Sequence, residues 1–320
     1  MSWHLVAPTA QGSEATQLRG LLAEKLRGDE FFWLDLHGPT AEDIELLRDL
    51  FGFHPLAVED SEHFGQRPKA EDYEDFVFLV LYGWSPDEDG LVEVHSFLSE
   101  RFLVTVRRDE APSLDALRVR FERDLGRFPQ GTLVLYEVID SLVDDFFPVV
   151  EQLDERLDLI EEHIFASPKP EHLEDIFAMK RRLVRLRRVV APQRDLLGRI
   201  AGGAVELPGM TTDVDRYFRD VYDHLVRLSE AIDGDREMMN VAIDAYLSIA
   251  SNRLNVTTKQ LAVIATIFLP LTFVTGFFGQ NFGWMVDHVD SWQMFVALGL
   301  GLEVLTLIAL LVLFRLRGWF

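Results

Sequence analysis

The chain has 320 residues, of which 48% are hydrophobic and 26% charged, so it can bury a sizeable core and is not a disordered peptide. A net charge of -22 argues against nucleic acid as a partner and against binding to anionic membrane surfaces, and it makes small cations the natural counter-species. Because the chain has no cysteine, disulfides, zinc knuckles and thiol nucleophiles are excluded, and any metal ligands must be carboxylates, histidines or amides.

The first third of the chain mixes two kinds of periodicity. Strand-like apolar runs occur at 31–36, 76–84 and 101–108, whereas residues 41–50 have the spacing of an amphipathic helix. This mixture predicts an α/β domain. The chain has neither a GxxxxGK[ST] phosphate loop nor a GxSxG nucleophile elbow, so we do not expect an enzyme.

Helical spacing replaces the strand-like runs from about residue 132. It predicts a long helix that ends at the Ser-Pro-Lys-Pro run of 167–170, and a second helix over about 171–200. The second helix carries the basic run MKRRLVRLRR at 179–188. We expect this run to pair with the acidic helix before it, with anionic lipid headgroups as the alternative partner.

A heptad-like seam of apolar residues follows. Its members are Val214, Phe218, Val221, Leu225, Leu228, Ile232, Met239, Ala242, Tyr246 and Ile249. No proline or glycine interrupts the chain between Asp235 and the first apolar run, which predicts one helix over about 213–280, roughly 100 Å long at 1.5 Å per residue. We expect the seam to serve oligomerisation; in the alternative it packs only within its own domain.

Two uncharged or nearly uncharged runs, 261–278 and 292–314, are each long enough to cross about 30 Å of hydrocarbon. Lys259, Arg315 and Arg317 flank one side of this hairpin, whereas the connecting loop carries Asp287 and Asp290 and no basic residue. By the positive-inside rule we expect a multi-pass protein of the cell inner membrane with both termini in the cytoplasm.

The expected order along the chain is therefore an acidic cytoplasmic α/β domain (1–210) with a helical hairpin (about 132–200), a stalk helix (211–258), a first transmembrane helix (259–280), an outer loop (281–291), a second transmembrane helix (292–314) and a basic cytoplasmic tail (315–320). Small and hydroxylated residues form a stripe along the first span, which must face a neighbouring helix or a water-filled axis. Glu303 lies within the second span and is a functional candidate by default; the alternative is a protonated carboxyl bonded to a neighbouring helix.

Several segments together resemble the CorA family of divalent metal-ion transporters. They are HPLAVEDSEHFGQRPKAEDYEDFVFLVLY at 54–82, IDSLVDDFFPVVEQLDERLDLIEE at 139–162, YFRDVYDHLVRL at 217–228 and SNRLNVTTKQLAVIATIFLPLTFVTGFFGQNFGWM at 251–285. The resemblance implies a funnel-shaped homopentamer in which the first transmembrane helices surround a pore and the second form an outer ring.

The resemblance also implies site residues. The selectivity filter would be Gly279, Gln280 and Asn281, where the family has Gly-Met-Asn. The matching pore-lining positions are Asn255, Thr258, Leu261, Leu269, Thr272 and Gly276. Neutral amide oxygens at the outer mouth would accept hydrogen bonds from hydrated Mg²⁺ without stripping its waters, while Asp287 and Asp290 would concentrate cations there.

We expect Mg²⁺ both as the transported ion and as a regulatory ligand, with no organic cofactor. The implied partners are further copies of the chain, the lipid bilayer and divalent cations. Mg²⁺ is favoured because the pore face offers no His or Cys for softer ions. Gln280 in place of Met leaves two alternatives, a zinc transporter of the ZntB type or a non-transporting, membrane-anchored metal sensor.

Bound cations would relieve repulsion between acidic domains. In the resemblance, Asp220 matches a stalk carboxylate that shares metal with the next subunit, and we expect Asp87 or Asp89 to be its partner.

Overall fold

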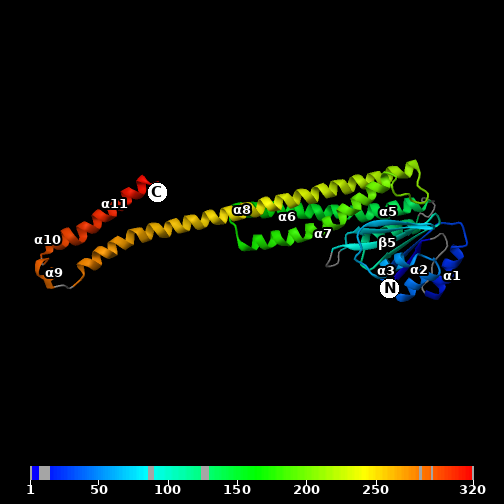
Figure 1. The fold of residues 1–320 in the computed structure, drawn as a ribbon, viewed down its shortest axis with the longest axis horizontal. Helices are drawn as coiled ribbons and strands as arrows, with labels where there is room; N and C mark the ends of the chain where they lie inside the picture. Colours follow the sequence, from blue (N-terminus) through cyan, green and yellow to red (C-terminus); the bar gives the residue numbers. More distant parts are fainter. Residues whose placement is uncertain are drawn as a thin grey trace. The chain divides into compact units, whose positions relative to one another are not determined.

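The computed structural model describes residues 2–6, 15–85, 90–123, 130–280, 283–289 and 291–318. It divides into two compact units, residues 1–243 and 244–320. One helix, α8 (Thr212–Phe278), contributes to both units (Figure 1). This confirms the prediction of a single helix over about 213–280, because α8 runs through Pro270 without ending.

The first unit is built on a six-stranded sheet with the order β1-β2-β6-β5-β4-β3. The strands are β1 (Ser2–Val6), β2 (Phe32–His37), β3 (Lys69–Tyr73), β4 (Phe76–Gly83), β5 (Val92–Leu98) and β6 (Phe102–Arg107). Strands β2 and β6 are parallel, and the other neighbouring pairs are antiparallel. Every residue of β4, β5 and β6 is buried, which accounts for the near-continuous apolar run of β4. The predicted α/β class is confirmed, whereas β1, β3 and β5 were not predicted.

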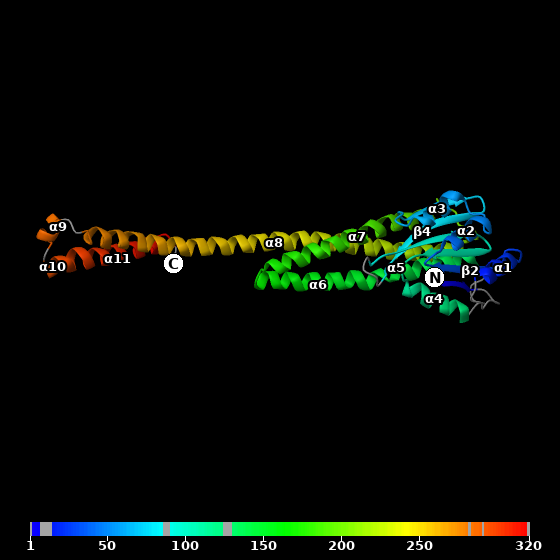
Figure 2. The same ribbon diagram turned by 90° about the horizontal axis from the view of Figure 1, so that it is seen from below.

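The first unit also contains the helices that precede α8. They are α1 (Ala15–Lys25), α2 (Ala41–Asp49), α3 (Pro55–Glu62), α4 (Pro112–Arg123), α5 (Gly131–Asp144), α6 (Phe146–Ala166) and α7 (Pro170–Ala201). Helix α5 lies against β4, β5 and β6, and α7 lies against β3 and β4 (Figure 2). Gln193 of α7 holds β4 directly, since its amide bonds both the backbone N–H and the carbonyl of Tyr82.

The apolar seam of α8 is buried within the chain itself from Val214 to Ala242. The alternative that it packs on its own domain therefore holds for this part, because these side chains are already covered and cannot form an oligomer contact. Polar contacts fix α7 to α8, since Arg187 donates to Asp233 at 2.6 Å and Arg194 to Ser229 at 3.1 Å. Arg187 of the basic run thus pairs with α8, where pairing of the run with α6 was expected.

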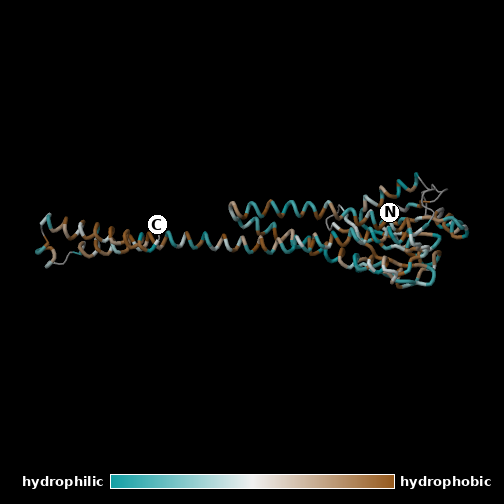
Figure 3. The backbone as a smooth tube through the Cα atoms, turned by 90° about the horizontal axis from the view of Figure 1, so that it is seen from above, coloured by the Kyte–Doolittle hydropathy of each residue, from teal (hydrophilic) through white to brown (hydrophobic). Residues whose placement is uncertain are grey.

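The second unit holds the apolar half of α8, then α9 (Gly283–His288), α10 (Trp292–Met294), the π-helix η1 (Phe295–Gly301) and α11 (Leu302–Leu316). Two of its helical stretches, the end of α8 and Trp292–Leu316, are long and apolar enough to cross a membrane (Figure 3). None of their apolar windows is buried within the chain. The length of the two apolar runs predicted both stretches, but it did not predict the π-helical turns.

Candidate ion pathway and metal centre

The positions expected to line a pore form an exposed stripe on α8. All of them are exposed in the single chain: Asn255, Thr258, Leu261, Leu269, Thr272 and Gly276. Leu269 is 76% exposed although it is apolar, so an isolated chain leaves this face uncovered.

The stripe lies on the far side of α8 from the second span. Val274 and Phe278 line a cavity shared with Glu303 of the second span. Thr272 precedes Val274 by two positions, and Gly276 precedes Phe278 by two. Two positions correspond to about 200° around a helix with 3.6 residues per turn. The stripe is therefore available to neighbouring subunits or to a pore, while the opposite face of α8 serves the hairpin.

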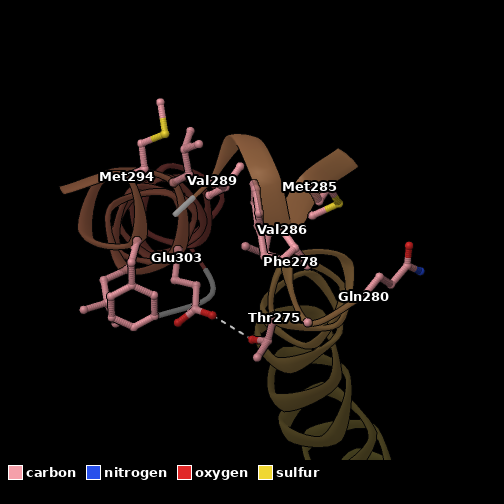
Figure 4. A pocket seen from close by; sticks show the side chains of 14 residues that line it. Thr275, Phe278, Gln280, Met285, Val286, Val289, Met294 and Glu303 are labelled. Atoms are coloured by element: carbon pink, nitrogen blue, oxygen red, sulfur yellow. Dashed lines mark hydrogen bonds between the residues drawn. The ribbon is translucent and has the colours of Figure 1, made fainter. Parts of the chain in front are cut away.

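The filter residues that the structure describes lie directly after α8. The N–H of Gly279 donates to the carbonyl of Thr275 at 2.9 Å, and the N–H of Gln280 donates to Phe277 at 3.3 Å. Both residues are exposed, and the Gln280 amide points away from Glu303 (Figure 4). Asp287 is exposed on α9, whereas Asn281 and Asp290 lie outside the described residues.

A candidate metal centre lies in the first unit, where α5 and α8 bring Asp140, Asp144 and His224 together. Their ligand atoms lie within 4.8 Å of one another. The Nδ1 atom of His224 is 3.5 Å from Asp144 Oδ1 and 3.8 Å from Asp140 Oδ1. These distances are too long for hydrogen bonds, but they approach the separation of about 3.4 Å between ligands held about 2.1 Å from a tetrahedral ion.

Two atoms of this cluster lack a hydrogen-bond partner. His224 Nδ1 and Asp140 Oδ1 are buried, and neither is hydrogen-bonded within the described part of the chain. Burial, with the neighbouring Asp144 carboxylate, raises the pKa of Asp140 to about 6. A cation bound between these atoms would satisfy both of them and would neutralise the carboxylates.

Asp220 lies on the other side of the same imidazole. Its Oδ2 atom is 3.8 Å from His224 Nε2, so His224 stands between Asp220 and the Asp140–Asp144 pair. A carboxylate beside the second nitrogen is the usual arrangement for orienting a metal-bound histidine. The sequence pointed to Asp220 but missed Asp140, Asp144 and His224; the i, i+4 spacing within IDSLVDD and DVYDH was the available signal. Asp87 and Asp89 lie outside the described residues.

Comparisons with known proteins find relatives described as metal-ion transporters. The family described as "CorA-like Mg2+ transporter protein" matches residues 28–316. YfjQ of Bacillus subtilis (strain 168), provisionally described as a metal ion transporter, is 34% identical over 315 residues and covers 98% of each chain. The cobalt/magnesium transport protein CorA of Thermotoga maritima is 32% identical over 295 residues, which are 90% of this chain and 83% of that one.

A zinc transport protein is a more distant relative. ZntB of Yersinia enterocolitica is 28% identical over 245 residues, covering 73% of this chain and 74% of its own. Among solved structures, the complete CorA magnesium transporter of Methanocaldococcus jannaschii matches with a TM-score of 0.80 at 22% identity, over 91% of this chain and 92% of that one. This likeness extends through both units of the fold.

Proposed function

This chain belongs to the CorA-like Mg²⁺ transporter family, and on that premise we propose that it conducts hydrated Mg²⁺ through the axis of a homopentamer. Family membership makes it a membrane transporter of divalent metal ions and not an enzyme. The observation that carries the finer proposal is the exposed, uncharged stripe of α8 from Asn255 to Gly276. Because polar groups in lipid must be covered, five such stripes around one axis form a wet pathway.

The chemistry of this pathway favours a hydrated, hard cation. Mg²⁺ gives up its water shell reluctantly, so neutral oxygens that accept hydrogen bonds from those waters suit it. Gln280 and Asn281 supply such oxygens at the end of α8, and Asp287 adds negative charge nearby. Softer transition ions usually select His or Cys, and the stripe contains neither. The ZntB relative makes zinc the competing cargo.

We assign gating to the cluster around His224. With both termini in the cytoplasm, Asp140, Asp144 and His224 sample the internal metal concentration. Exposed Asp220, on the other side of the imidazole, is placed to hold a separate ion together with the next subunit. A bound cation offsets repulsion between acidic stalks and holds the pore closed, whereas depletion restores the repulsion and loosens the assembly. The imidazole makes this site bind Zn²⁺ or Co²⁺ more tightly than Mg²⁺.

Flux measurements on purified protein in liposomes loaded with a Mg²⁺ indicator test the function. An inside-negative membrane potential is expected to drive Mg²⁺ influx that protein-free liposomes do not show. Parallel assays with Zn²⁺ and Co²⁺, with and without a pH gradient, identify the cargo and any proton coupling. Faster Zn²⁺ than Mg²⁺ flux would support a zinc transporter, and intact protein that binds metal without flux would support a sensor.

Removing one ligand of the cluster should weaken inhibition by internal metal. We expect Asp140→Asn and His224→Ala each to raise the half-inhibiting metal concentration about 10-fold or more, as loss of groups at a metal site commonly does. Asp213→Asn is the matched control, because Asp213 is an exposed acid on the same helix outside the cluster. Wild-type inhibition in Asp140→Asn would remove the cluster from the gating mechanism.

The same site predicts a pH dependence. The pKa of Asp140 is raised to about 6, so the carboxylate is largely ionised at pH 7.5 and becomes protonated as the pH falls through 6. Metal binding requires the ionised form, so inhibition should weaken on acidification. Asp140→Asn is expected to reduce this pH dependence without abolishing it, because the His224 imidazole must also be unprotonated to bind the ion. Flux assays at graded internal pH would measure the difference.

A further inference from the structure

Glu303 is the one charged residue in the apolar run 292–314. It is the second residue of α11, just after the π-helix η1. Such π-helical turns occur frequently at functional sites. An ionised carboxylate is costly at membrane depth unless it is paired. The surroundings of Glu303 therefore decide which form it takes.

The hydrogen count at Thr275 indicates that Glu303 carries a proton. Thr275 Oγ1 lies 2.8 Å from the carbonyl oxygen of Leu271 and 2.7 Å from Glu303 Oε1. The hydroxyl has a single hydrogen, and the carbonyl has none. Both contacts are full hydrogen bonds only when Thr275 donates to Leu271 and a protonated Glu303 donates to Thr275.

The cavity beside this pair points to the same protonation state. It has a volume of about 720 Å³, and its lining includes the apolar side chains of Phe278, Val286 and Leu298. Among the described residues that line it, Glu303 is the only titratable one. The charged or titratable neighbours on α9, Asp287 and His288, do not line it. No cation in the described surroundings therefore balances an ionised Glu303.

The pair also connects the second span to the filter. Glu303 and Thr275 point toward each other across the hairpin (Figure 4). The carbonyl of Thr275 accepts the N–H of Gly279, so the same residue that contacts Glu303 also ends the last turn of α8. A displacement of Thr275 would therefore shift Gly279 and Gln280.

We propose that Glu303 is held protonated within the membrane and, by donating to Thr275, positions the last turn of α8 and the filter residues that follow it. It is a positioning residue, because it acts on Gly279 and Gln280 through Thr275. Its effect on flux rests on the proposed transport function. Its protonation does not, and the two are tested separately.

Infrared difference spectroscopy of the purified full-length protein tests the protonation. At neutral pH, wild type minus Glu303→Gln should show the carbonyl stretch of a protonated carboxylic acid, and Thr275→Val should shift that band by removing the hydrogen-bond partner. A carboxylate signal in its place at neutral pH would overturn the proposal. This result stands whether or not the protein transports Mg²⁺.

Flux assays test the positioning role. Glu303→Gln keeps a donor and an acceptor and should retain wild-type flux, as should Thr275→Ser. Glu303→Ala and Thr275→Val should each lower flux about 3- to 10-fold, the worth of one hydrogen bond between membrane helices. Thr306→Val is the control, since the Thr306 hydroxyl donates to the carbonyl of Leu302 in its own helix. Unchanged flux in Glu303→Ala, with wild type active, would overturn the role; a silent wild type would instead refute the proposed function.

Discussion

Replacing Asn281 by alanine is expected to reduce Mg²⁺ flux at least about 10-fold, because each lost hydrogen bond to a charged partner costs about 1.5–3 kcal/mol and the change removes a ring of them. Asn281 follows Gln280 at the end of the stripe-bearing helix, where the proposed pathway meets the outer loop. The measurement is indicator influx into liposomes under a fixed membrane potential.

Gln293→Ala is the matched control for Asn281→Ala. Gln293 is an exposed amide on α10, beyond the proposed filter, so its loss should leave flux near the wild-type level. Equal losses in both variants would point to a general defect of the outer loop. Wild-type flux in Asn281→Ala would exclude the proposed amide ring.

Cysteine substitutions on the stripe should make transport sensitive to thiol reagents. The chain has no native cysteine, so Thr272→Cys and Leu269→Cys each introduce a unique target. Both positions are exposed in the single chain and face away from the second span. If five copies of the stripe surround a wet axis, a charged, membrane-impermeant methanethiosulfonate should react there and abolish flux, because a bulky charge then blocks the path.

The control position is exposed but lies off the stripe. Ile264 is 53% exposed, and it lies about 140° around the helix from Leu269 and about 120° from Gly276. Ile264→Cys is expected to keep its flux after the same treatment, since this residue faces lipid or a neighbouring helix. Block at Ile264 with none at Thr272 would place the pore on a different face of α8.

Much of the architecture follows from local sequence pattern. The apolar runs 261–278 and 292–314 carry at most one charge over a length that crosses a bilayer, and the heptad-like spacing after residue 213 predicts a helix. Both became helices in the structure. Strands β1, β3 and β5 were missed because pattern alone identifies strongly apolar strands best, and β3, with the sequence KAEDY, is stabilised by pairing with β4.

The sequence by itself determined the membrane hairpin, the long helix, the acidic character and the family resemblance, because these depend on composition and on periodicity along one element. The tertiary structure alone decided which face of each helix is covered and by which other part of the chain. It buried the seam of α8 from Val214 to Ala242 inside its own domain, left the stripe around Leu269 exposed, and brought Asp140 to His224 and Thr275 to Glu303. Residues distant along the chain meet only when the packing of whole helices sets their register, and no local pattern records that register.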